Sequence, residues 1–125
     1  MFEYLVFYEY VSLSPVSLEI RLERVEDSLH YRIKRTGYMS GDKHFIEDVY
    51  SGDVEGFIEK LEGFHVEDWP LSFFEPVVDG QGWSLRYKEV GKPCRKIEGH
   101  NAYPEKFEDF VNLLLSVTAG RREGK

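Results

Sequence analysis

Apolar and polar side chains alternate along three successive segments at the start of the chain. Residues 2–11 are apolar or aromatic at every second position and mixed at the others, which predicts a strand that is covered on both sides. Residues 16–23 and 29–34 alternate between apolar and polar positions, which predicts two half-buried strands. Turn-forming residues separate the three segments, so we expect an antiparallel meander.

Two later stretches repeat their apolar residues at helical spacing. Residues 53–63 begin with Asp53, a favoured N-cap residue, and end with a glycine that can stop a helix. In residues 104–120, Pro104 fits the first helical position and the apolar stripe ends near Gly120. The pattern therefore predicts two amphipathic helices.

A β-hairpin is predicted between these helices. Alternation runs through both of its arms, and a three-residue loop at 91–93 places Tyr87 opposite Ile97. The same register sets His100 opposite Ser84. The start of the first arm therefore meets the end of the second.

The elements combine into one α+β domain. A short apolar run at 45–50 predicts a fourth strand, whereas residues 64–80 lack a period and indicate a long packed connector. The order βββ(β)αββα favours an antiparallel sheet with two helices packed on one face. We expect the domain to span residues 1–118 and residues 119–125 to form a frayed tail.

Composition supports a folded protein in a reducing compartment. Of the 125 residues, 42% are hydrophobic and 15% aromatic, enough for one core. The lone Cys94 cannot form an internal disulfide bond. Residues 1–20 lack the basic start and apolar run of a signal peptide or membrane span. A cytoplasmic protein without a membrane partner is therefore expected.

The net charge of −7 is concentrated in the middle of the chain. Residues 41–80 hold eleven acidic and two basic side chains. Such a surface repels phosphate backbones, so no nucleic-acid partner is expected; it either attracts a cationic partner or simply keeps the protein in solution. The hairpin instead carries a basic set that can meet an acidic partner or RNA, or simply remain solvated: Arg86, Lys88, Lys92, Arg95 and Lys96.

The last third of the chain resembles a known family. The motif DGxxWxL at residues 79–85 and the motif GxNAYPxxF at residues 99–107 are followed by a leucine-rich helix. This pattern resembles the C-terminal part of a family of small uncharacterised prokaryotic proteins, over residues 76–117. The family has no established activity, so the resemblance implies a shared hairpin–helix fold and no catalytic residue. His100 stands where a small polar residue is expected.

One cluster of polar and aromatic residues is a candidate pocket. His100 beside a carboxylate can act as a general base, and an amide or phenol can orient a polar substrate. The alternative is that these groups serve turns and caps, with Asn101 bonding the backbone and Tyr103 packing on the core. The candidate pocket comprises Glu75, Asp79, Trp83, His100, Asn101 and Tyr103.

No cofactor or metal is expected. His44 and Asp48 lack a third ligand, and they lie too far apart to bind one ion if residues 45–50 form a strand. No glycine-rich loop leads from a strand into a helix, as phosphate binding would need.

These observations favour a non-catalytic module that binds a protein. Its contact surface would be either the acidic stretch 41–80 or the aromatic connector around Trp69, and the closest functional analogy is an accessory or immunity-like protein. A homodimer is also plausible, through an edge strand or a second aromatic face of residues 2–10. The alternative is a small enzyme or ligand-binding protein with its pocket near His100, Asp79 and Glu75.

Overall fold

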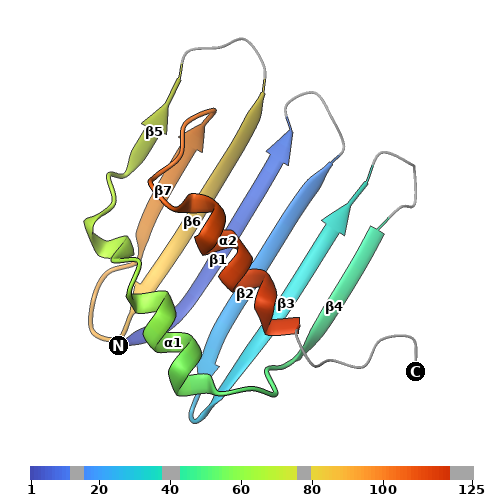
Figure 1. The fold of residues 1–125 in the computed structure, drawn as a ribbon, viewed down its shortest axis with the longest axis vertical. Coiled ribbons are helices and arrows are strands. Elements are labelled where there is room, and N and C mark those ends of the chain that lie inside the picture. Colours follow the sequence, from blue (N-terminus) through green and yellow to red (C-terminus); the bar gives the residue numbers. More distant parts are fainter. Residues whose placement is uncertain (12–15, 38–42, 76–79, 119–125) are drawn as a thin grey trace.

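The chain forms one seven-stranded sheet with two helices on one of its faces (Figure 1). A computed structural model describes residues 1–11, 16–37, 43–75 and 80–118. The strand order is β4-β3-β2-β1-β6-β7-β5. The strands are β1 (Phe2–Val11), β2 (Ser17–Val25), β3 (Ser28–Thr36), β4 (Lys43–Val49), β5 (Ser72–Phe74), β6 (Gln81–Glu89) and β7 (Arg95–His100).

The predicted fold class is confirmed. Strands β1 to β4 form a meander, and β1 also pairs with β6, so the first strand lies in the middle of the sheet. The helices are α1 (Val54–Glu62) and α2 (Phe107–Leu115), each followed by a short 3₁₀ turn, η1 (Val66–Asp68) and η2 (Ser116–Thr118). Helix α2 runs diagonally across the middle strands (Figure 1).

Helix α1 has the predicted bounds, and helix α2 does not. Asp53 caps α1, because its carboxylate accepts a hydrogen bond of 3.1 Å from the amide of Gly56. Helix α2 begins at Phe107 rather than at Pro104, after Lys106 in a left-handed conformation (φ 63°). In the segment before the helix, the carbonyl of Ala102 accepts a hydrogen bond of 2.9 Å from the Trp83 indole and so is fixed on β6.

The hairpin forms, but its predicted register is wrong by two residues. Tyr87 lies opposite Arg95, and Leu85 rather than Tyr87 lies opposite Ile97. The reason is a longer turn, since five residues (90–94) instead of three separate β6 from β7. Side chains alternate with a period of two, so this shift leaves every side chain on its predicted face.

The connector 64–80 contains a strand that the sequence does not reveal. Strand β5 pairs in parallel with β7, where Phe73 lies opposite Gly99, and it forms one edge of the sheet. Three residues are too few to display a periodic pattern. The connector also places Trp69 in the core, with 9% of its surface exposed and its ring 5.1 Å from that of Phe110.

The core lies between the helices and the face of the sheet that they cover. It is built mainly from alternate residues of the central strands and from the inner faces of α1 and α2. Its largest fully buried side chains are Phe2, Leu5, Phe7, Ile20, Leu22, Leu29, Leu61, Trp83, Leu85, Tyr87, Ile97 and Phe110.

Candidate interaction surface

The opposite face of the sheet, here called the open face, is not covered by α1 or α2 (Figure 1). Strand β1 contributes Tyr4, Val6, Tyr8 and Tyr10 to it, since these alternate with the buried residues of the same strand. Tyr8 and Tyr10 are 37% and 38% exposed, and their rings stack at 5.6 Å between centroids. We call these two residues the tyrosine pair. The open face thus carries an exposed aromatic patch at the centre of the sheet.

A glycine lets one of these rings lie across the neighbouring strand. Tyr10 is opposite Gly82 of β6, and a Cβ atom at position 82 would fall on the phenol ring. The ring therefore occupies the space that a side chain would fill. Tyr10 remains 38% exposed in this position.

Four cationic side chains form a row across the open face at the level of Val6. Val6 lies opposite Arg21 of β2 on one side and Arg86 of β6 on the other. Arg21 is opposite Arg32 of β3, and Arg86 is opposite Lys96 of β7. We call these four residues the cation row. It crosses five adjacent strands with a single apolar residue at its centre.

The cation row is largely unneutralised. Arg32 approaches Glu47 at 3.9 Å, whereas Arg21, Arg86 and Lys96 form no ion pair with any residue that the structure describes. Like charges directly opposite one another destabilise a sheet. The row therefore costs folding stability and presents guanidinium groups, which bind carboxylates in a bidentate manner.

The structure brings only part of the candidate pocket together. His100 lies opposite Gly82, and its ring stacks on Phe74 with 5.7 Å between centroids. His100 and Trp83, together with Tyr10 and Phe74, border a hollow of about 320 Å³. Glu75 is exposed just after β5, and its amide donates to the carbonyl of His100 at 2.9 Å.

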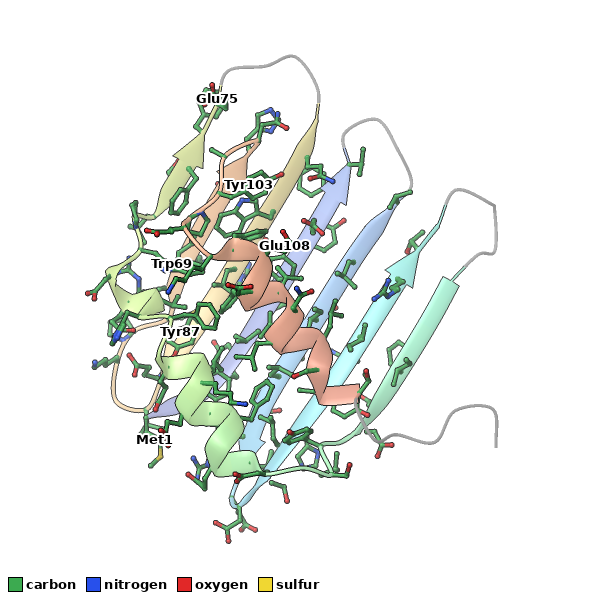
Figure 2. All side chains as sticks on the ribbon, in the orientation of Figure 1. Met1, Trp69, Glu75, Tyr87, Tyr103 and Glu108 are labelled. Atoms are coloured by element: carbon green, nitrogen blue, oxygen red, sulfur yellow. The ribbon has the colours of Figure 1, made fainter. Side chains whose placement is uncertain are left out.

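Trp83, Asn101 and Tyr103 each form a hydrogen bond with a nearby residue of the chain. Asn101 Oδ1 accepts a hydrogen bond of 3.0 Å from the amide of Gln81, and the Tyr103 hydroxyl donates to Gln81 Oε1 at 2.9 Å. Tyr103 also packs 4.9 Å from the ring of Phe107, beside the start of α2 (Figure 2). These contacts match the structural alternative for the cluster. Asp79 lies outside the described residues.

Glu9 is a titratable residue that the sequence analysis did not single out. It lies opposite Leu18 and Trp83 on the covered face, and burial raises the pKa of its carboxyl group. The pKa of Tyr103 is raised as well, first by burial and then by the charge of Glu9. Its signal in the sequence was a single acid at an apolar position of the first strand.

A groove of about 1050 Å³ lies on the helical side of the molecule. Trp69 and Phe73 contribute to its apolar lining, and Lys60, Asp68 and Lys106 bring charges of both signs. This mixed lining does not select a ligand of one chemistry.

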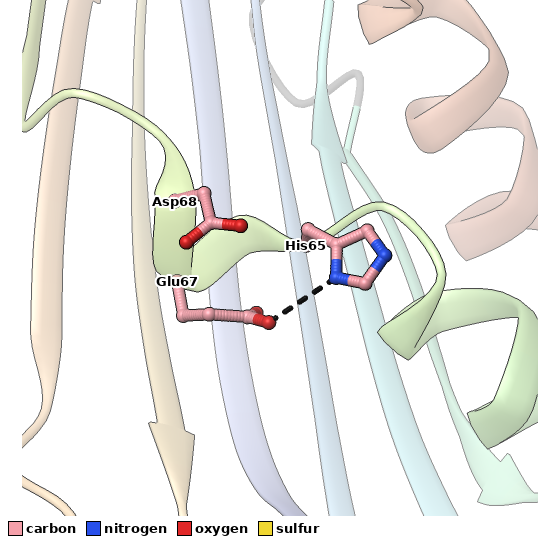
Figure 3. Close-up of side chains that lie close together, drawn as sticks. All are labelled: His65, Glu67 and Asp68. Carbon is pink, nitrogen blue, oxygen red and sulfur yellow. Dashed lines mark hydrogen bonds and ion pairs between the residues drawn. The ribbon is translucent and has the colours of Figure 1, made fainter.

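Three potential metal ligands lie close together beside η1 (Figure 3). His65 Nδ1 is 3.3 Å from Glu67 Oε1, and a carboxylate oxygen of Asp68 lies within 4.8 Å of both ligand atoms. All three residues are exposed. A surface ion pair accounts for this arrangement, as the figure illustrates.

No helix in the described part of the chain has the length and apolar character needed to cross a membrane. No protein-family model, curated protein or solved structure matches the chain. The resemblance of residues 76–117 to a family of small prokaryotic proteins therefore stays a prediction, and function has to be argued from the surface itself.

Proposed function

We propose that this protein is a non-catalytic interaction module, of the accessory or immunity-like kind, that binds an acidic partner protein through the open face of its sheet. The cation row is the observation that carries the proposal. Aligned like charges lower folding stability, and a partner that presents carboxylates to the row offsets this cost. The tyrosine pair adds the exposed aromatic contact that is enriched at protein interfaces.

The charge distribution favours a protein over a nucleic acid as the partner. The chain carries a net charge of −7, which repels a phosphate backbone. On the open face itself, Glu19 lies opposite Tyr8, and Glu98 lies opposite Ser84. A protein surface with localised carboxylates can meet the row and avoid these acids, whereas a continuous polyanion cannot.

The open face is favoured over the aromatic connector as the contact surface, because Trp69 at the centre of the connector is buried. The proposal also includes self-association of the chain, for which the exposed edge of β4 is the relevant surface.

A cytoplasmic location belongs to the same proposal and is supported by the lone cysteine, which fits a reducing compartment.

Affinity capture from the native lysate at physiological salt tests the proposal. The parent protein should retain a partner, and two double variants should lose it: Arg21→Glu with Arg86→Glu, and Tyr8→Ser with Tyr10→Ser. Recovery of the partner should fall at least tenfold with either variant. The arginine variant should unfold at the same or a higher temperature than the parent, because it replaces like-charge pairs by opposite-charge pairs.

Lys60→Glu with Lys106→Glu is the matched control. These lysines are exposed on the helical side, and the substitutions change the net charge by the same amount. The control should retain the partner. Absence of any partner, or equal retention by the open-face variants and the control, would overturn the proposal.

The second candidate, a small-ligand-binding protein or enzyme, is favoured by Glu9 rather than by His100. Glu9 and Gln81 border a hollow of about 350 Å³, and the raised pKa of Glu9 suits a group that exchanges protons. A ligand screen followed by thermal unfolding tests it. A ligand that stabilises the parent and not Glu9→Gln would favour this candidate.

A further inference from the structure

We propose that the outer edge of β4 pairs with β4 of a second copy of the chain and forms an antiparallel homodimer. This inference concerns the edge of the sheet rather than the centre of the open face, and the two surfaces meet at Glu47, which lies 3.9 Å from Arg32 of the cation row. Strand β4 ends the sheet, and among the described residues β3 is the only strand that pairs with it. At seven residues, β4 is longer than the three-residue strand at the opposite edge. A long unpaired edge is a template for another strand.

The ladder identifies the backbone groups that face outward. The amide of Tyr50 donates to the carbonyl of Leu29 at 2.8 Å, so the even-numbered residues of β4 direct their amides toward β3. The odd-numbered residues direct theirs away from the sheet. At one end of this edge, the Asp48 carboxylate accepts a hydrogen bond of 2.8 Å from the outward amide of Val49. Within the part of the chain that the structure describes, the outward backbone groups from Lys43 to Glu47 are available to a second strand.

The sequence of this edge is self-complementary. Lys43 and Glu47 stand two residues before and two residues after Phe45, and all three positions belong to the open face. When two copies meet with Phe45 at the twofold axis, Phe45 lies opposite its copy and Lys43 lies opposite Glu47 on both sides. Each of these pairs exchanges its backbone hydrogen bonds. Phe45 is 57% exposed in the monomer, and contact with its copy covers part of that surface.

Charge selects this register over its neighbours. An axis at Glu47 places two glutamates opposite each other, which is unfavourable. An axis at Ile46 places Phe45 opposite Glu47 and leaves Lys43 without an acid. Only the axis at Phe45 matches both charges and pairs the exposed aromatic residue with itself.

The dimer joins two sheets edge to edge with both open faces on the same side, because residues opposite one another in an antiparallel pair share a face. An interface made by one strand from each copy is small. Interfaces below about 1,200 Å² are characteristic of weak association. The dimer should therefore form with rising protein concentration and dissociate on dilution.

Sedimentation velocity of the full chain over a concentration series tests the inference. The parent should shift from monomer to dimer, and Lys43→Glu or Glu47→Lys alone should raise the dissociation constant at least tenfold. The double variant Lys43→Glu with Glu47→Lys restores both opposite-charge pairs and should recover the parental constant. This recovery separates charge pairing at the edge from any effect of a single variant on folding.

Phe45→Pro supplies a second measurement. Its amide faces outward, so a proline there removes no hydrogen bond within the monomer, and proline is tolerated at such edge positions. The variant should unfold cooperatively and stay monomeric at every concentration. A parental protein that is monomeric throughout, a dimer that survives Phe45→Pro, or a double variant that stays as weak as the single ones would each overturn the inference.

Discussion

Two glycines, on neighbouring strands, lie beneath aromatic rings on opposite faces of the sheet. A Cβ atom at Gly99 would fall on the indole of Trp83, and one at Gly82 would fall on the phenol of Tyr10. Trp83 is 2% exposed and fixed in the core, whereas Tyr10 can turn into solvent. The same added methyl group therefore has different consequences at the two positions.

Gly99→Ala should destabilise the protein by about 1–3 kcal/mol, the usual cost of overpacking a core. Gly82→Ala is the matched control and should cost less than Gly99→Ala, because the Tyr10 ring that the added methyl group meets is 38% exposed and can move into solvent. Urea denaturation monitored by tryptophan fluorescence measures both. Equal losses for the two variants would contradict the assignment of Trp83 to a rigid site.

Glu9 gives the protein a pH dependence of defined sign. Burial raises the pKa of its carboxyl group in the folded state above the ordinary value of 4.5. The favourable contribution of the protonated form is then fully present below the unfolded pKa and is lost as pH rises through the folded pKa. Glu9→Gln should therefore raise the melting temperature at pH 7, and the gain should shrink toward pH 4. A gain of the same size at both pH values would contradict this reasoning.

At the scale of elements, the start of α1 depends on one side chain. Asp53 has an extended backbone and accepts a hydrogen bond from the amide of Gly56, which would otherwise lack a helical partner. Asp53→Ala should lower the free energy of unfolding by about 1 kcal/mol. Asp53→Ser keeps an acceptor in place and should recover most of the loss. Urea denaturation of the two variants measures the difference.

Elements specified by local residues were predicted well, and elements specified by distant neighbours were not. The cap and the final glycine of α1 lie beside the helix in the chain, so its bounds followed from the sequence. Strand β5 exists because the edge of β7 offers hydrogen bonds, and nothing within its three residues signals this. The hairpin register failed for a related reason, since it depends on the length of a turn whose ends are not marked in the sequence.

At the scale of the whole molecule, the open face was predictable only in part. The aromatic second face of residues 2–10 was apparent from alternation alone. The cation row was not apparent from the sequence, because Arg21 and Arg86 become neighbours of Val6 only when β1 lies between β2 and β6. In the candidate pocket, two residues that are close in the chain turn out to be apart in the structure. The left-handed turn at Asn101 (φ 53°) separates His100 from Tyr103, although they are close in the chain.

The position of β1 also bears on how the protein is made. The middle strand of the sheet, β1, leaves the ribosome well before its partner β6, which is complete only at residue 89. Until then, one side of β1 has no native strand to pair with, and the aromatic residues of β1 lack part of their packing. Nascent chains halted before β6 should therefore associate with chaperones or aggregate, and those extended beyond it should not.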